Sequence, residues 1–337
     1  MKKQTVIVLI NKTAANDYVN KDTQGRIDVI KAACESAENL ISYKNQSVSS
    51  SEIRAIIVAP EYFLSKKSDG ILYINRDEMV EARNKIMEVS KKYKNIVIVP
   101  GSVAYYKQIQ NNDKGIARAK KALDRLDNEI KSSSSIKIHA NDGSEVKDQI
   151  AYNNYVATWN NKLNNIINNG MKDNVFIYSN SMLVFFNGNI WKHRKSIGFN
   201  ENKNAPNELL SINRPDTSGI VNIAGRTFGL EICYEHNRGT LSSFTAKTAV
   251  DFHLVVSDWV STGNSDKINL KYDGYFIHSS TQYNENSVLN SKLNPTYTVN
   301  TGNDFLMYVI NTPEKSSSME GIGVADVIKK NKPMALK

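Results

Sequence analysis

The stretch Arg226-Thr-Phe-Gly-Leu-Glu-Ile-Cys-Tyr-Glu235 joins an apolar, strand-like run to one of the two cysteines of the chain. A cysteine at the end of a buried strand is held rigidly, while the turn after it leaves the sulfur accessible. The backbone N–H that follows can face a negative charge developing on a substrate. The stretch therefore predicts an α/β sheet with a candidate nucleophile, Cys233, at the end of one strand.

Two further segments place a charged side chain beside an apolar strand pattern. Upstream, Ala55-Ile-Ile-Val-Ala-Pro-Glu61 ends in a carboxylate, and Trp191-Lys-His-Arg-Lys195 ends in an ammonium group. Taken singly, Glu61 could be a surface acid, Lys195 part of a solvated basic cluster, and Cys233 a buried thiol. Their shared context favours a functional site, because an α/β sheet gathers functional groups at the carboxyl ends of its strands.

The length and composition suit an enzyme. At 337 residues and 40% hydrophobic content, the chain can bury a large core. Its formal charge of +9 arises from basic and acidic residues interspersed along the chain rather than massed in blocks. The sequence has no zinc-finger spacing, no RNP-like aromatic motif and no long basic run with interleaved aromatics. We therefore interpret the charge as solubility rather than as a nucleic-acid interface.

Cysteine usage and apolar runs indicate the compartment. Cys34 and Cys233 lie far apart, which argues against a disulfide framework and fits a reducing environment. The apolar start, Met1–Ile10, is followed by no small-residue cleavage site, so it predicts a buried first strand rather than a signal peptide. No apolar run approaches the roughly 20 residues that a membrane span needs. We expect a cytoplasmic protein without membrane contact.

Apolar runs predict the strands of the sheet, and several are continuous, as in strands covered on both faces. The runs are Val6–Ile10, Ala55–Ala59, Ile96–Val99, Met182–Phe186, Phe228–Ile232, Phe252–Val256 and Phe305–Ile310. Apolar residues recur at helical spacing over Gly25–Tyr43 and Arg76–Lys94, and Cys34 falls on the apolar stripe of the first segment, as a core residue. This alternation predicts α/β layers around one core.

A polar segment at about 107–175, rich in Lys and Asn, interrupts the alternation and could contain one short helix at Ala117–Ile130. A segment of this length inside a compact domain is typical of a lid, a partner surface or partial disorder. We expect a single domain over residues 1–325 that carries this insertion, with a basic C-terminal tail at 326–337. Closure of the insertion over the site is a hypothesis.

The sequence carries no metal or cofactor signature. Its five histidines show no paired ligand spacing, and His253 lies inside an apolar strand pattern. Gly321-Ile-Gly323 is too short to indicate a dinucleotide site. We expect chemistry that needs neither a metal nor an organic cofactor.

Three short motifs, in this order, resemble those of the nitrilase superfamily of carbon–nitrogen hydrolases, which carries a Glu-Lys-Cys set. Pro60–Tyr62 resembles the glutamate motif, His193–Lys195 the lysine motif and Ile232–Glu235 the nucleophile motif. The superfamily has a second glutamate between its lysine and its cysteine. The segment Glu208-Leu-Leu-Ser-Ile-Asn-Arg-Pro-Asp-Thr217 resembles that region better than the nearer Glu201 does. The resemblance spans roughly residues 4 to 312.

The chain departs from the usual pattern at positions that bear on the substrate. Ile197 replaces a histidine, and His236-Asn-Arg-Gly239 replaces an arginine-proline pair after the nucleophile. Glu235 stands where many amidase-like members have aspartate, whereas glutamate there is found in nitrilases and in the lipoprotein acyltransferase branch. These departures leave the identity of the substrate open.

The resemblance implies a four-layer α-β-β-α sandwich and an enzyme that hydrolyses a non-peptide carbon–nitrogen bond, in the first place an amide. Cys233 would attack the substrate, Glu61 would serve as base and acid, Lys195 would stabilise the developing charge, and Glu208 would orient the leaving nitrogen. An acyl thioester would form, with release of ammonia or an amine. Further residues would bind the substrate or its oxyanion: Tyr234, Glu235, Trp259 and Tyr62.

Other functions stay open on the same scaffold. Nitrile hydrolysis or N-acyl transfer would use the same site. A non-enzymatic binding protein would use the scaffold but not the catalytic site. Retention of Glu61, Lys195 and Cys233 favours an enzyme, because a scaffold has no chemical need for all three. The expected partners are a small-molecule amide or nitrile and, by the same resemblance, a second copy of the chain in a homodimer or higher homo-oligomer.

Overall fold

The computed structural model describes residues 4–10, 18–43, 52–67, 71–108, 117, 138–139, 145–146, 161, 176–195, 209–211, 219–245, 249–260, 265–296, 298–301 and 304–313. Most of the predicted insertion at 107–175, including the helix predicted at Ala117–Ile130 beyond its first residue, lies outside these ranges, as does the tail at 326–337. Within these ranges, no helix is long and apolar enough to cross a membrane.

The described strands form one ten-stranded sheet, one five-stranded sheet and a separate two-stranded pair. The ten-stranded sheet has the order β16-β17-β1-β2-β4-β8-β5-β3, with β9 and β10 both paired to β8. Its strands are β1 (Gln4–Ile10), β2 (Ala55–Val58), β3 (Tyr73–Asn75), β4 (Ile96–Val99), β5 (Ser102–Gln108), β8 (Phe176–Phe186), β9 (Asn189–Arg194), β10 (Leu209–Ser211), β16 (Thr298–Thr301) and β17 (Phe305–Asn311). The central strands β1, β2 and β4 are parallel.

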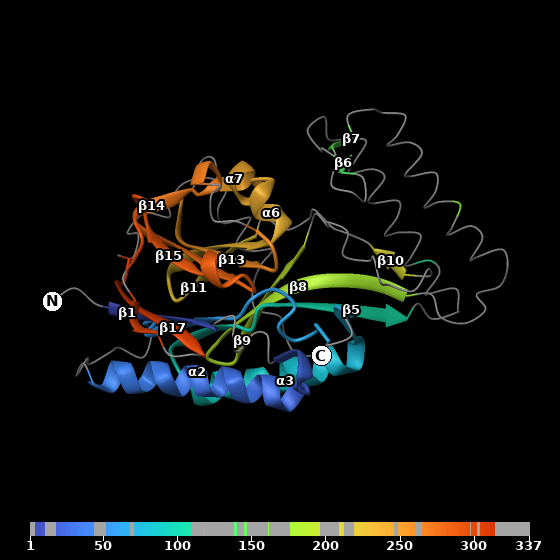
Figure 1. Ribbon diagram of the computed structural model, residues 1–337, viewed down its shortest axis with the longest axis horizontal. Coiled ribbons are helices and arrows are strands. Elements are labelled where there is room, and N and C mark those ends of the chain that lie inside the picture. Colours follow the sequence, from blue (N-terminus) through green and yellow to red (C-terminus); the bar gives the residue numbers. More distant parts are fainter. Residues whose placement is uncertain are drawn as a thin grey trace.

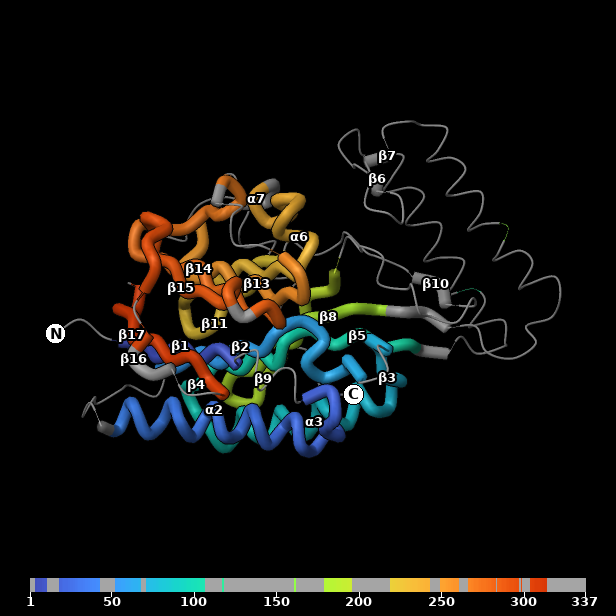
Figure 2. The backbone as a smooth tube through the Cα atoms, in the orientation of Figure 1, coloured from blue at the N-terminus to red at the C-terminus, as the bar shows by residue number. Residues whose placement is uncertain are grey.

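The five-stranded sheet comes from the second half of the chain, as Figure 2 shows in yellow to red. Its strands, in spatial order, are β11 (Ile220–Ile223), β12 (Arg226–Ile232), β13 (Val250–Ser257), β14 (Leu270–Ser280) and β15 (Ser287–Asn290). Strands β12, β13 and β14 run parallel, so their carboxyl ends meet at one edge. The two-stranded pair consists of β6 (Ile138–His139) and β7 (Glu145–Val146).

Helices and sheets are stacked in layers (Figure 1). Helices α2 (Thr23–Tyr43) and α3 (Arg76–Lys92) lie along one face of the ten-stranded sheet, and the five-stranded sheet lies on the other side. The short helices α6 (Tyr234–Asn237) and α7 (Thr240–Thr245) pack on β12. The predicted mixed α/β class is confirmed.

Alternating side chains of each central strand enter two different cores, which explains the continuous apolar runs. In β1, Val6, Val8 and Ile10 belong to the core beneath the helices, whereas Ile7 and Leu9 belong to the core between the sheets. A strand covered on both faces needs apolar residues at every position. All seven predicted strand runs coincide with strands of the structure, except that Ala59 lies one residue beyond the end of β2.

The two predicted helices are also present, with small differences at their ends. Helix α2 begins two residues before the predicted start, and α3 ends two residues before the predicted end. Asn75 and Glu78 form a capping box at the start of α3, in which each side chain accepts a hydrogen bond from the other residue's backbone N–H. Cys34 is fully buried in the core under α2, as predicted.

Candidate active site

Glu61 lies in the turn that follows β2, and both of its carboxylate oxygens accept hydrogen bonds. Oε1 accepts from Nζ of Lys195 at 2.9 Å and from Nδ2 of Asn180 at 3.0 Å. Oε2 accepts from the backbone N–H of Asp258 at 3.1 Å. Because Glu61 is fully buried, these charged and polar partners replace the water that an ionised carboxylate would otherwise bind.

The turn carrying Glu61 is held by residues whose role the motif patterns did not predict. Arg26 of α2 donates from Nη1 to the carbonyl of Phe63 at 3.2 Å and from Nη2 to the carbonyl of Lys66 at 2.7 Å. Gly101 lies directly against this turn, since a Cβ built on it would be 1.9 Å from the Pro60 carbonyl oxygen. These contacts link residues too far apart in sequence for local patterns to join them.

Lys195 directly follows β9, and its backbone and side chain are both fixed. Its N–H donates to the carbonyl of Asn180 at 2.9 Å, which continues the pairing of β8 with β9. Its ammonium group is buried and forms the 2.9 Å ion pair with Glu61. Asn180 therefore contacts both residues, through its carbonyl and through its side-chain amide. No motif in the sequence assigned a role to Asn180.

Cys233 lies at the carboxyl end of β12, directly before α6, in an unusual backbone conformation. Its φ is 52° and its ψ is −111°, a combination that residues with a side chain rarely adopt. Its N–H donates to the carbonyl of Val256 in β13 at 2.8 Å. Strain of this kind persists only where surrounding contacts over-determine the geometry, and it occurs preferentially at functional sites.

The environment of the Cys233 thiol raises its pKa. Burial is the largest cause, followed by the negative charge of Glu61, and a hydrogen bond to that carboxylate acts in the same direction. The ammonium of Lys195 and a hydrogen bond with the backbone of Asp258 oppose these effects. The resting thiol is therefore protonated at neutral pH, close to a carboxylate that can take its proton and to a cation that favours the thiolate.

Three predicted site residues from different parts of the chain thus meet: Glu61, Lys195 and Cys233. Asp258, at the end of β13, joins them through its backbone N–H. Its side chain is held by Lys66 Nζ at 3.2 Å and by the hydroxyl of Thr281 at 2.6 Å. The parallel β12–β13 pair explains this arrangement, because it brings Cys233 and Asp258 to the same edge of the sheet.

The remaining predicted site residues have different surroundings. Glu208 lies outside the described residues. Tyr62 follows Glu61, is buried against Ala104, and has a positive φ of 60°. Tyr234 is half-buried in the first turn of α6, whereas Trp259 is 77% exposed next to Asp258.

Glu235, predicted to bind the substrate or its oxyanion, is fully buried and contacts protein groups. Its Oε2 accepts hydrogen bonds from the backbone N–H of Ile232 and from Nε2 of His193, both at 2.8 Å. Burial alone would lower the pKa of His193, but the negative charge of Glu235 and their hydrogen bond outweigh burial and raise it. The two side chains form a buried, hydrogen-bonded pair near the nucleophile.

The described residues contain one group that could hold a metal ion: Glu231, His236 and His253. Oε2 of Glu231 accepts from Nδ1 of His236 and from Nε2 of His253, both at 2.8 Å. The opposite ring nitrogens of the two histidines are buried without a partner. A metal bound at the near nitrogens would leave two buried N–H donors unpaired, whereas histidine ligands normally donate that proton to an acceptor. The group therefore fits a hydrogen-bonded network better than a metal site.

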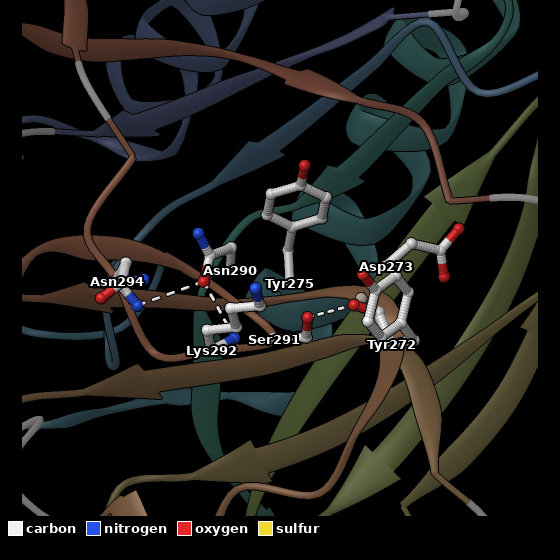
Figure 3. Close-up of a pocket in the computed structure, with 8 residues that line it drawn as sticks. Tyr272, Asp273, Tyr275, Asn290, Ser291, Lys292 and Asn294 are labelled. Carbon is white, nitrogen blue, oxygen red and sulfur yellow. Dashed lines mark hydrogen bonds between the residues drawn. The ribbon is translucent and has the colours of Figure 1, made fainter.

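A surface hollow of about 360 Å³ lies along β14 and β15, apart from the residues just described (Figure 3). It is lined by Tyr272, Asp273, Gly274, Tyr275, Asn290, Ser291, Lys292 and Asn294. Half of these residues come from the amino-terminal half of β14 and the others from the end of β15 and the residues after it, whereas Cys233 and Asp258 lie at the carboxyl edge of the sheet. The hollow therefore does not include the candidate catalytic group.

Neither protein-family models nor the sequences of curated proteins give a match to this chain. Among solved structures, Nit3 of Saccharomyces cerevisiae, a member of branch 10 of the nitrilase superfamily, is similar with 12% identity and a TM-score of 0.47, over 92% of this chain and 90% of that one. An amidase from Nesterenkonia sp. is similar with 11% identity and a TM-score of 0.46, over 94% of each chain. A variant of the Nesterenkonia sp. AN1 amidase, with acrylamide added at its active-site cysteine, has 10% identity and a TM-score of 0.48, over 92% of this chain and 93% of that one.

Proposed function

We propose that this protein is a cysteine-dependent hydrolase of a non-peptide carbon–nitrogen bond, with a small amide as its substrate. One observation supports the proposal above all others. The carboxylate of Glu61 binds the ammonium of Lys195 at 2.9 Å, and both charges act on the pKa of the Cys233 thiol. A nucleophile, a base and a cation gathered in one place have no structural explanation as simple as the catalytic one.

The first chemical step transfers the thiol proton of Cys233 to Glu61. The sulfur then forms a bond to the amide carbon, and negative charge moves onto the substrate oxygen. Lys195 and the backbone N–H of Tyr234 stabilise that oxygen, and donors of this kind each contribute roughly 3 to 4 kcal/mol to lowering the barrier.

Collapse of the tetrahedral intermediate breaks the carbon–nitrogen bond. Glu61 returns its proton to the leaving nitrogen, so that ammonia or an amine departs and an acyl thioester remains on Cys233. A water molecule, deprotonated by Glu61, then attacks the thioester and releases the acid. Glu208 is proposed, from the motif resemblance alone, to orient the leaving nitrogen. The reaction as written uses no metal and no organic cofactor.

Two related reactions would use the same first step. A nitrile would give a thioimidate on Cys233 before ammonia is released, and an amine in place of water would complete an N-acyl transfer. Nothing in the described residues favours either over amide hydrolysis. Self-association into a homodimer or higher homo-oligomer is proposed from the resemblance, and light scattering of the purified chain would test it.

The proposal is tested by measuring ammonia release from primary amides, carbamoyl compounds and nitriles. We expect release by the wild type and its loss in Cys233→Ala, by at least about three orders of magnitude. Cys34→Ala is the matched control, because Cys34 is the other cysteine and is buried in the core, remote from the site. Retention of more than about a tenth of the activity in Cys233→Ala would contradict the proposal.

A further inference from the structure

His193 and Glu235 connect β9, which Lys195 directly follows, to the turn that carries Cys233. Side chains alternate along β9, so that Trp191, His193 and the following Lys195 lie on one side of the strand and are all buried, whereas Ile190 enters the core beneath the helices. Trp191 belongs to the core between the two sheets. His193 and Lys195 therefore enter the same inter-sheet space from one rigid strand.

The ring of His193 reaches the five-stranded sheet. A Cβ built on Gly219, next to β11, would lie 3.5 Å from Cε1 of His193 and 2.5 Å from the carbonyl oxygen of Leu230. A side chain at this position would collide with the Leu230 carbonyl, whereas its contact with the ring would be an ordinary one, and the φ of Gly219 is +66°. The ring of His193 therefore packs against the backbone of the second sheet at Gly219.

Glu235 receives His193 and also holds the backbone next to the nucleophile. One oxygen, Oε2, accepts both the His193 ring N–H and the N–H of Ile232, the residue before Cys233. Glu235 follows Cys233 by two positions, so its side chain folds back across the strained residue. The carboxylate thereby ties both sides of Cys233 to the strand of Lys195.

We propose that His193 and Glu235 are a positioning pair that sets the ammonium of Lys195 relative to the thiol of Cys233, without touching the substrate. This role deepens the proposed function, on which it rests. Both side chains are buried, and the carboxylate of Glu235 binds the ring of His193 and the backbone of Ile232. Removal of either side chain lets the two sheets shift locally, because the remaining buried polar group must find water or another partner.

The test is a double-mutant cycle on thiol reactivity, which needs no knowledge of the substrate. The rate at which iodoacetamide alkylates Cys233 at neutral pH is followed by peptide mass spectrometry, which separates Cys233 from Cys34. In the wild-type background we expect Lys195→Ala to slow alkylation about tenfold or more, the effect of about one pKa unit. In the Glu235→Ala background the same change is expected to slow it less than about threefold, because the ammonium is no longer held beside the thiol.

Asp251→Asn is the matched control. Asp251 is also a fully buried carboxylate that accepts from one backbone N–H, that of Thr227 at 2.6 Å, and from one cation, Lys271 at 2.9 Å. It lies at the amino end of β13, away from Cys233. A positioning role specific to Glu235 predicts that the full Lys195 effect survives in Asp251→Asn. If the effect of Lys195→Ala is lost in the Asp251→Asn background, the loss is a general consequence of removing a buried charge, and the proposal is overturned.

Two further variants keep the test decisive. Glu235→Gln retains an acceptor for Ile232 and an amide that can donate to neutral His193, so it should restore most of the Lys195 effect. If Glu235→Ala does not fold, His193→Phe replaces it, since phenylalanine fills the ring volume but removes the donor. An undiminished Lys195 effect in Glu235→Ala or His193→Phe would overturn the proposal. This result is independent of the ammonia assay, whose failure would remove the proposed function but not the coupling.

Discussion

At the scale of single residues, the candidate site depends on the charge of one buried carboxylate. Glu61 binds Lys195, Asn180 and the Asp258 backbone at once, and its negative charge raises the pKa of the Cys233 thiol. A glutamine at this position would keep most of the shape of the Glu61 side chain but could not take a proton from the thiol. It would also leave the ammonium of Lys195 buried without its counter-charge, which is costly.

We therefore expect Glu61→Gln to lower kcat by at least about a thousandfold while the far-ultraviolet circular dichroism stays that of the wild type. The measurement is steady-state turnover of the best amide from the ammonia panel. Lys66→Gln is a control at a lysine near the site that contacts the side chain of Asp258 but not Glu61. If Glu61→Gln has the same kcat as Lys66→Gln, Glu61 is not the base.

Sequence patterns predicted the three catalytic candidates but not the residues that hold them. Each of Glu61, Lys195 and Cys233 follows a strand-like run, and that local signal is enough to propose them. Arg26 and Asn180 carry no such signal, because their roles arise from contacts across 35 or more positions. The motif resemblance proposed Glu235 as a substrate ligand, whereas the structure shows its carboxylate paired with His193.

At the scale of elements, the site depends on turns that follow parallel strands. The turn after β2 packs against Gly101, whose φ of +74° and missing Cβ let the Pro60 carbonyl approach. An alanine would place a Cβ 1.9 Å from that oxygen, far inside contact distance. Because Glu61 directly follows Pro60, the turn would have to move, and the carboxylate would move with it.

Gly101→Ala is expected to destabilise the fold by about 2 kcal/mol or more and to reduce turnover by a larger factor than the loss of folded protein explains. Urea unfolding and turnover at a temperature where the variant stays folded separate the two effects. Gly225→Ala is the control, because Gly225 has a similar φ of 76° in the turn between β11 and β12, outside the site. Equal specific activity of the two variants would contradict this account of the turn.

The strands were predictable because both of their faces are buried, which makes the apolar runs continuous and easy to recognise. Their order in the sheets was not predictable from the runs, since the neighbour of β4 is β8, more than 75 positions further along the chain. The short helix α6 gave no periodic signal either, because four residues are too few to show one.

At the scale of the whole molecule, buried titratable groups in the five-stranded sheet tie stability to pH. Burial opposes ionisation of Glu231, but hydrogen bonds from His236 and His253 outweigh it and lower its pKa to about 2. Burial, followed by the charges of His236 and His253, lowers the pKa of His278 to about 3. Burial also lowers the pKa of His253.

These shifts act in the same direction. A carboxylate with a lowered pKa stabilises the fold above its unfolded value and loses that contribution as the pH falls toward the folded value. A histidine kept neutral by burial also stabilises the fold above its unfolded value, since the unfolded chain takes up the proton first. His193 acts oppositely, because its raised pKa favours the fold at low pH and loses that contribution as the pH rises through the raised value.

We expect the free energy of unfolding to fall by several kcal/mol as the pH is lowered from about 7 to about 4, because each unit of pKa difference corresponds to about 1.4 kcal/mol. Urea titrations across this range measure it. His278→Asn keeps a partner for the Ser257 hydroxyl but cannot titrate, so its profile should be shallower. An unchanged slope in that variant would show that His278 contributes nothing to the acid sensitivity.

The central claim is that Cys233 carries an acyl group during turnover, and trapping that species tests it most directly. The wild type is mixed with the amide that gives the fastest ammonia release, quenched in acid within one turnover, and mapped by mass spectrometry of its cysteine peptides. We predict the mass of the acyl group on the peptide of Cys233, none on that of Cys34, and removal of the label by neutral hydroxylamine, which cleaves thioesters. The acyl group accumulates when the ammonia-releasing step is faster than hydrolysis of the thioester. If ammonia is released under that condition while the Cys233 peptide stays unmodified at every quench time, the account is contradicted.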